Sequence, residues 1–309
     1  MGAEVSVARS AAFALALLTL GAASSTAASG ENYALVISGA SGGDPYSAKY
    51  AAWRQSFVST LRTRLGYHDD HIIVMAESAG AGIRMATREE VRKAILALRN
   101  RLTADDQLLV LLIGHGTAAD GPRGEDARFN LVGPDLKASE WGELLKPVTA
   151  RVIFVDTTAA SSPFLRHLSS PGRIVITATD STAQEFETVF GEFFVRAFED
   201  PAADADKNGR VSVFEAFSYA GGASRAWYEQ RGQLASERPV IDGDALARTT
   251  FVQPLAVPQD AAEAAFAKRQ RELESQIEDL KRRRTSMSPA AYDAELERLL
   301  LELARVSRP

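Results

Sequence analysis

The sequence predicts an α/β fold, a three-layer sandwich with a mostly parallel sheet, followed by a C-terminal α-helical hairpin. Short, continuous apolar runs recur between residues 33 and 177, which is typical of strands buried on both faces. Amphipathic stretches separate these runs, and strands that alternate with helices form parallel sheets covered on both sides. After about residue 257 the pattern changes to helical spacing with many charges.

The apolar runs predict strands at residues 33–38, 72–75, 107–113, 151–155 and 173–177. The first helix is expected at 47–65, where large apolar residues are spaced by four. Thr87 and Glu90 form a capping-box pattern, in which each side chain caps the backbone of the other, so a helix begins there. Further helices are predicted at 137–145, 192–198 and 214–228.

The C-terminal segment, residues 258–309, is expected to form a helical hairpin or a short coiled coil beside a main domain at 31–250. An apolar stripe marks its first helix, and Ser288 and Pro289 are typical of the start of its second. The residues of the two apolar faces are Phe266, Leu273, Ile277, Leu280, Leu296, Leu299, Leu300 and Leu303. Leu299 and Leu300 diverge by about 100°, so one of them should lie partly outside the hairpin. The main domain or a second copy would cover it, the latter making a homo-oligomer.

Composition excludes several classes of function. The 309 residues include 35 Lys and Arg against 40 Asp and Glu, a net charge of −5, so we expect no nucleic-acid partner. The chain has no cysteine, which excludes disulfides, Cys-ligated metals and any cysteine nucleophile.

Residues 1–28 are typical of a secretory signal peptide. Arg9 precedes an apolar run at 11–20, and small residues follow up to Ala27 and Ala28, where cleavage is expected. An uncleaved anchor is the alternative, but the run is shorter than the ~20 residues that span a bilayer. We therefore expect an exported protein, periplasmic or extracellular, that does not span the membrane after cleavage.

Two loops follow adjacent predicted strands and carry groups with catalytic chemistry. His115 stands between two glycines after the run at 107–113, where it suits a general base or a turn. Residues 155–164 follow the next strand and are small and hydroxylated, which leaves room for a substrate or a tight turn. Loops at the carboxyl ends of parallel strands commonly form functional sites.

Residues 33–220 resemble the caspase–legumain family, nearest to bacterial legumain-like peptidase domains. The His115-Gly116 pair is similar to the family's His-Gly motif, and residues 156–161 lie over its Glu/Asp-Ala-Cys-x-Ser-Gly motif. The resemblance implies a caspase-like three-layer fold and a cysteine peptidase site. Thr158, however, stands at the position of the family's cysteine.

The threonine at this position predicts a pseudo-peptidase. A thiol is partly ionised near neutral pH, whereas a hydroxyl is not, and threonine nucleophiles typically need an N-terminal amine as base. The expected function is binding of a peptide or protein without catalysis. The alternatives are an active hydrolase in which His115 acts with Ser161, Ser162 or Thr158, and a structural envelope protein that acts through its hairpin.

Residues 204–215 match a complete EF-hand calcium loop, with oxygen ligands at positions 1, 3, 5, 7, 9 and 12 and glycine at position 6. The predicted ligands are Asp204, Asp206, Asn208, the Arg210 carbonyl, Ser212 and Glu215. A solvated, acidic helix cap is the alternative. A lone loop outside the cytosol would bind calcium at roughly 10⁻⁴–10⁻³ M, which suits a structural clamp.

Overall fold

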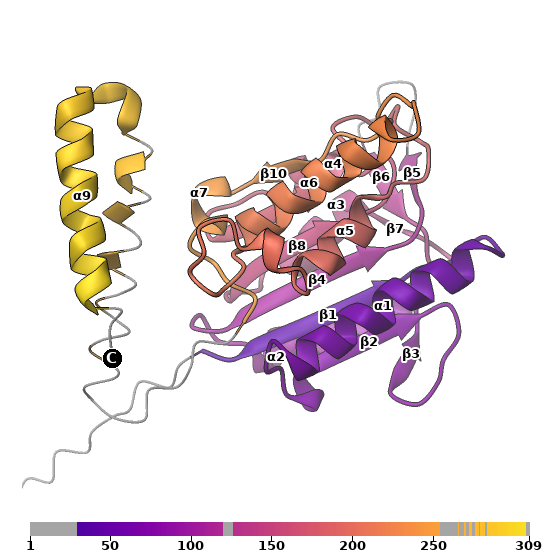
Figure 1. The fold of residues 1–309 in the computed structure, drawn as a ribbon. Coiled ribbons are helices and arrows are strands. Elements are labelled where there is room, and N and C mark those ends of the chain that lie inside the picture. Colours follow the sequence, from indigo (N-terminus) through magenta and orange to yellow (C-terminus); the bar gives the residue numbers. More distant parts are fainter. Residues whose placement is uncertain are drawn as a thin grey trace, which may run out of the picture.

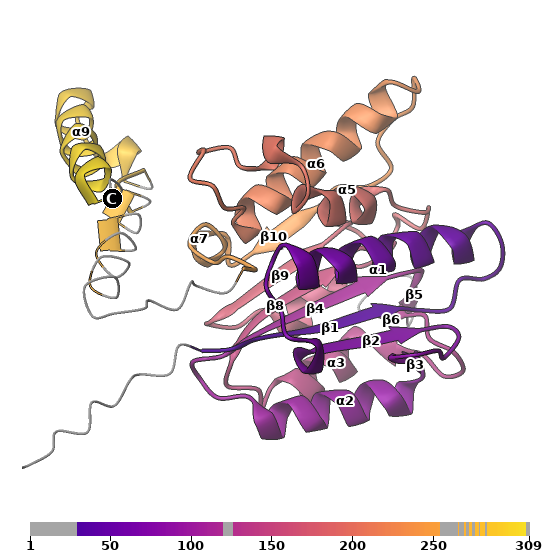
Figure 2. The same cartoon turned by 60° about the horizontal axis from the view of Figure 1, so that its bottom comes forward.

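The computed structural model describes residues 30–119, 126–253 and 283–306, together with single positions between 265 and 281. The predicted fold class is confirmed: within these residues a seven-stranded, mostly parallel sheet has helices on both faces (Figures 1 and 2). The predicted signal peptide and Phe266 lie outside the described residues.

The strand order of the large sheet is β10-β9-β8-β4-β1-β2-β3. All neighbours run parallel except β10, which is antiparallel to β9. The strands are β1 (Asn32–Ser38), β2 (Ile72–Ala76), β3 (Ile83–Met85), β4 (Gln107–Ile113), β8 (Arg151–Asp156), β9 (Arg173–Thr177) and β10 (Val240–Asp242). The five predicted strands are among them, and every residue of the apolar run in β4 is buried.

Alternate residues of each central strand supply the two hydrophobic cores. In β1, Ala34 and Val36 face one core, and Leu35 and Ile37 face the other. Helices α1 (Tyr46–Thr63), α5 (Phe190–Ala197) and α6 (Val213–Glu229) cover the first face. Helices α2 (Arg88–Arg101), α3 (Ala138–Leu145) and α4 (Pro163–Leu168) cover the second.

Short elements that the sequence patterns do not predict complete the domain. A small antiparallel sheet contains β5 (Gly116–Ala119), β6 (Asp126–Phe129) and β7 (Leu136–Lys137). Helix α7 (Asp244–Ala247) follows β10, and 3₁₀ turns occur at η1 (Asp69–His71) and η2 (Pro201–Ala203). Pro163 and Phe164, which we expected to end a loop, begin helix α4 (Pro163–Leu168).

The capping box at α2 is only half formed, which corrects the prediction. Thr87 Oγ1 accepts a hydrogen bond from Glu90 N at 3.3 Å, as expected. The Glu90 carboxylate instead accepts from Lys93 at 2.7 Å, and Thr87 N donates to the Met85 carbonyl in β3. The backbone of Thr87 is therefore held by the edge strand that sequence analysis missed.

The C-terminal part contains η3 (Arg284–Ser286) and α9 (Pro289–Val306). Helix α9 packs with Leu273, Ile277 and Leu280 in a small apolar cluster separate from the two cores of the sheet domain. Leu299 is 2% exposed in that cluster and Leu300 is 48% exposed, which agrees with their expected divergence. No helix in the described part of the chain is long and apolar enough to cross a membrane. The limits of the predicted segments 1–28, 31–250 and 258–309 stay predictions.

Candidate functional site

The two predicted motifs meet at the carboxyl edge of the large sheet. His115 comes two residues after β4, and Thr158 comes two residues after β8. Strands β4 and β8 are parallel neighbours, with Leu112 opposite Asp156, so their following loops start side by side. The sequence prediction that these loops share one site is therefore consistent with the sheet topology.

Thr158 is buried against the backbone of the neighbouring loop. It is 1% exposed, its hydroxyl donates to the Ala159 carbonyl at 3.3 Å, and its N–H donates to Asp156 Oδ1 at 2.9 Å. Gly116 lies directly over it, because a Cβ at position 116 would be 2.3 Å from Thr158 Oγ1. A substrate carbonyl has no approach to this hydroxyl.

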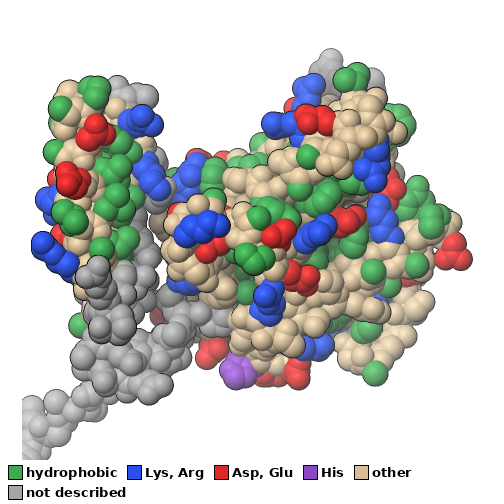
Figure 3. Space-filling model, viewed as in Figure 1, with side chains coloured by type: hydrophobic (Ala, Val, Ile, Leu, Met, Phe, Trp, Pro, Cys, Tyr) green, Lys and Arg blue, Asp and Glu red, His purple; other side chains and the backbone are tan. Residues whose placement is uncertain are grey.

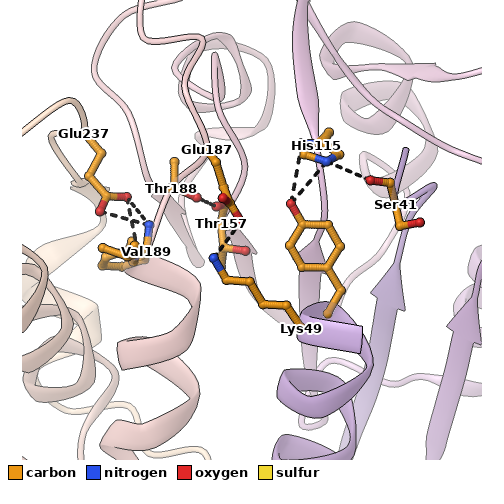
Figure 4. Close-up of polar contacts among 10 residues, drawn as sticks. Ser41, Lys49, His115, Thr157, Glu187, Thr188, Val189 and Glu237 are labelled. Atoms are coloured by element: carbon orange, nitrogen blue, oxygen red, sulfur yellow. Dashed lines mark hydrogen bonds and ion pairs between the residues drawn. The ribbon is translucent and has the colours of Figure 1, made fainter. Parts of the chain in front are cut away.

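His115 is half-buried and its polar contacts lie on the α1 side of the site (Figure 4). Its Nε2 donates to the Ser41 carbonyl at 2.9 Å, so this nitrogen carries the proton. The Tyr50 hydroxyl is 3.5 Å from Nδ1, and the Tyr46 ring packs edge-on against the imidazole. Burial raises the pKa of Tyr50, which keeps this phenol neutral beside the histidine.

Ser161 and Ser162 do not complete a catalytic pair. Ser161 is fully buried, and both its N–H and its hydroxyl bond to the Thr179 hydroxyl, at 2.8 Å and 3.0 Å. Ser162 is the N-cap residue of α4 and its side chain makes no capping bond. Within the described part of the chain, no hydrogen bond joins His115 to Thr158, Ser161 or Ser162.

The hydroxylated run after β8 fills the interior rather than leaving room for a substrate. Thr157 Oγ1 donates to the Leu112 carbonyl at 2.7 Å, and the Thr188 hydroxyl donates to the Thr157 carbonyl. Ala160 has a φ of +53°, a left-handed conformation that closes a tight turn. Of the two expectations for this loop, the structure shows the tight turn.

Asp156 is a buried carboxyl group beneath the loop that sequence analysis did not single out. It is fully buried, Oδ1 accepts only the Thr158 N–H, and Oδ2 has no hydrogen-bond partner. Burial raises the pKa of Asp156 to about 7, against the opposing effect of the Thr158 hydrogen bond. Its signals in the sequence are an acidic residue at the end of an apolar strand and its place at the start of residues 156–161.

Glu237 holds the start of α5 at the other side of the site (Figure 4). Its carboxylate is buried and accepts hydrogen bonds from Val189 N and Phe190 N, each at 3.1 Å. Burial raises the pKa of Glu237 to about 7, although these two backbone bonds favour the charged form. Nearby, Glu187 accepts from Lys49 at 2.6 Å. No local motif marks these residues, since each partner is distant in sequence.

The loop before α6 brings together three of the predicted calcium ligands. Ligand oxygens of Asp204, Asp206 and Glu215 all lie within 4.8 Å of one another. Burial, followed by the charge of Glu215, raises the pKa of Asp206. Three carboxylates held this close repel one another, and a divalent cation would relieve that repulsion. The donor set therefore fits calcium.

The backbone of this loop follows the EF-hand turn pattern. Asp204 accepts hydrogen bonds from Asn208 N at 3.1 Å and Gly209 N at 2.9 Å. Gly209 has a φ of +84°, which favours glycine at this position. Ser212 and Glu215 form the capping box of α6, so Glu215 belongs to both the loop and the helix. Asn208 Oδ1 accepts a hydrogen bond from Arg210 N at 2.9 Å.

The end of this loop is joined to the segment that contains Thr250 and Phe251. Ser212 forms an isolated antiparallel bridge with Phe251, and Val213 N donates to the Thr250 carbonyl at 2.9 Å. The Arg210 guanidinium lies over the Phe251 ring at 3.7 Å. The loop is thereby attached to the segment through which the chain leaves the domain.

No protein-family model matches the sequence, and no curated protein matches it. Among solved structures, the fold is similar to protein GSU0716 from Geobacter sulfurreducens, at 15% identity over 73% of this chain and 100% of that one, with a TM-score of 0.46. It is also similar to the Drosophila initiator caspase Dronc, at 10% identity over 72% and 83% of the two chains, with a TM-score of 0.44. Raptor from Chaetomium thermophilum is 10% identical over 57% of this chain and 19% of that one, with a TM-score of 0.33. Since these three TM-scores are below 0.5, we infer the function from this chain's own residues.

Proposed function

We propose that this chain is a caspase-like pseudo-peptidase that binds calcium through residues 204–215 and acts, after export, by binding a peptide or protein. The observation that supports the loss of catalysis is the state of Thr158, which is buried, bonded to backbone and covered by Gly116. A nucleophile must be exposed to its substrate and lie within hydrogen-bond reach of a base. Thr158 meets neither condition.

The environment of His115 supports the same proposal. A general base must offer a free nitrogen toward the nucleophile. Nε2 donates to the Ser41 carbonyl, and the Tyr50 hydroxyl lies against the ring, 3.4 Å from Nε2 and 3.5 Å from Nδ1. An active hydrolase would require the His115 and Tyr50 rings, and the loops after β4 and β8, to rearrange. Only then could His115 reach a hydroxyl of the run after β8.

Binding is proposed for the loop that follows β9. Phe186 is 75% exposed there, between Glu185 and Glu187, and large exposed aromatic residues are common anchors of protein interfaces. Glu187 is paired with Lys49, and the Glu185 carboxylate favours a peptide with a basic residue beside an apolar one. Export rests on the signal-peptide pattern of residues 1–28.

Hydrolysis of a mixed peptide library by the mature protein, with calcium or with chelator, tests the loss of catalysis. We expect no cleavage above buffer for the wild type or for the His115→Ala and Thr158→Ala variants. Cleavage that His115→Ala abolishes would show that the chain is a hydrolase.

A peptide array tests binding separately. We expect Phe186→Ala to reduce the wild-type signal, mainly on basic peptides. Leu96→Ala is the matched control, because Leu96 is also exposed but lies on α2. Equal loss of signal in both variants, or no signal from the wild type, would contradict the proposed binding role and leave the structural envelope function as the better explanation.

A further inference from the structure

Helix α9 carries a stripe of four residues on the surface of the hairpin, spaced by four. The outer stripe consists of Asp293, Glu297, Leu301 and Arg305. All four are exposed, and Leu301 is 53% exposed. Residues spaced by four form one ridge along a helix. In the ribbon views, α9 lies on the side of the hairpin away from the sheet (Figures 1 and 2).

Three leucines line the surface of α9 at and beside the outer stripe. A shallow groove on α9 is lined by Asp293, Leu296, Glu297, Leu300 and Leu301. Leu300 also lines a cavity of about 570 Å³ that Asn32 and Gln107 line from the sheet domain, whereas Leu301 does not. On the face of the hairpin that Figure 3 shows, apolar and charged side chains are mixed. Leu301 is therefore the large apolar residue of α9 that no other described part of the chain covers.

The charges of the outer stripe differ from the other charges of α9. Arg298 pairs with Glu295 at 2.7 Å and with Glu302 at 3.2 Å on the same helix. Asp293, Glu297 and Arg305 form no ion pair with any residue that the structure describes. The stripe is acidic before Leu301 and basic after it.

The charges of two copies of the outer stripe are complementary only when the two α9 helices run antiparallel. Glu297 and Arg305 are each four residues from Leu301, about 6 Å along the helix in opposite directions. A two-fold axis at Leu301 brings Glu297 opposite the partner's Arg305, and Arg305 opposite the partner's Glu297. A parallel arrangement would place like charges together instead.

We infer that the outer stripe of α9 is a homodimer interface, in which α9 helices of two copies pack antiparallel about Leu301. The ridge formed by residues spaced four apart on one helix fits into the groove beside the same ridge of the other helix. Each dimer contains two Glu297–Arg305 contacts and one shared apolar centre. This inference is independent of the proposed peptide-binding function, because it uses only the hairpin.

The test measures the dimer dissociation constant of the full mature protein by sedimentation over a range of concentrations. We expect a dimer that Leu301→Asp disrupts. Glu297→Arg and Arg305→Glu should each weaken the dimer by at least about tenfold, because each places like charges opposite one another twice. The double variant Glu297→Arg/Arg305→Glu should return to within a few-fold of the wild type.

Two controls keep the outcome decisive. Leu96→Asp places the same new charge on another exposed leucine and should leave dimerisation unchanged. Circular dichroism checks that each variant keeps its helix content. A wild type that is monomeric at all concentrations, a dimer that Leu301→Asp leaves intact, or a double variant as weak as the single ones would overturn the inference.

Discussion

Gly116 packs directly against Thr158: a Cβ at position 116 would be 2.3 Å from the Thr158 hydroxyl oxygen and equally close to the Ala159 carbonyl oxygen. The glycine beside His115 is thus required by a close approach between two loops. The loop after β4 and the loop after β8 form one packed unit, with no space for a reacting group between them.

Gly116→Ala should destabilise the domain by about 2–3 kcal/mol or more, because overpacking of a buried site forces neighbouring backbone to move. Gly80→Ala is the matched control, since a Cβ at position 80 would meet nothing within 4 Å. Urea unfolding measures both. Equal stabilities of the two variants would show that the loops have room to separate.

Calcium should raise the melting temperature of the mature protein, because an ion bound only by the native state adds ~1.4 kcal/mol at tenfold over its Kd. Glu215→Gln should remove this shift. Glu229→Gln, an exposed change at the far end of α6, should keep it. Melts in chelator and in millimolar calcium provide the comparison, and identical wild-type curves would refute calcium binding.

Because of Asp156, the free energy of unfolding should fall as the pH rises. The pKa of Asp156 is about 7 in the folded state, and near 4 in an unfolded chain, so the folded state holds one more proton between these values. Its contribution is fully present below pH 4 and is lost as the pH rises through 7. Asp156→Asn stays neutral, so between pH 5 and 7 the wild type should lose about 1 kcal/mol per pH unit relative to the variant.

The measurement is the free energy of unfolding of both proteins at pH 5, 6, 7 and 8. The raised pKa of Glu237 affects the two proteins equally. The difference between their free energies of unfolding therefore reports on Asp156. Parallel curves would mean that Asp156 is charged in the folded protein.

Glu237→Ala should destabilise the domain by about 1–3 kcal/mol, because it leaves the buried N–H groups of Val189 and Phe190 without acceptors. Glu237→Gln keeps one acceptor oxygen and should cost less. Thermal melts of the two variants at pH 8 rank them. If Ala proves as stable as Gln, the capping of α5 by Glu237 contributes nothing.

The central strands were predictable because their signal is local. β1, β4 and β8 are continuous apolar runs that face two cores, and such runs have few other uses in a globular chain. β7 and β10 contain two and three residues, too few for any period to be visible. α4 was missed because Pro163, which begins it, also marks loops.

The site was only partly predictable. Two motifs at the ends of neighbouring strands placed His115 near Thr158, and the fixed spacing of residues 204–215 identified the acidic cluster. The partners of His115 come from the loop after β1 and from α1, and the two N–H groups that Glu237 caps are 48 and 47 residues away. Such contacts depend on tertiary packing between residues that are distant in sequence, so no local sequence pattern predicts them.

The bridge between Ser212 and Phe251 has a mechanical consequence. The chain leaves the sheet domain through the segment that contains Thr250 and Phe251, so tension applied at the hairpin reaches the domain there. Two of the contacts that resist this tension are the Val213–Thr250 hydrogen bond and the stacking of Arg210 on Phe251, and both involve the loop that ends at Glu215. Two more are hydrogen bonds from the sheet, from Gln107 to the Phe251 carbonyl and from Asn32 to the Val252 carbonyl. An ion that stiffens this loop would therefore increase the force needed to detach the segment that contains Thr250 and Phe251 from the domain.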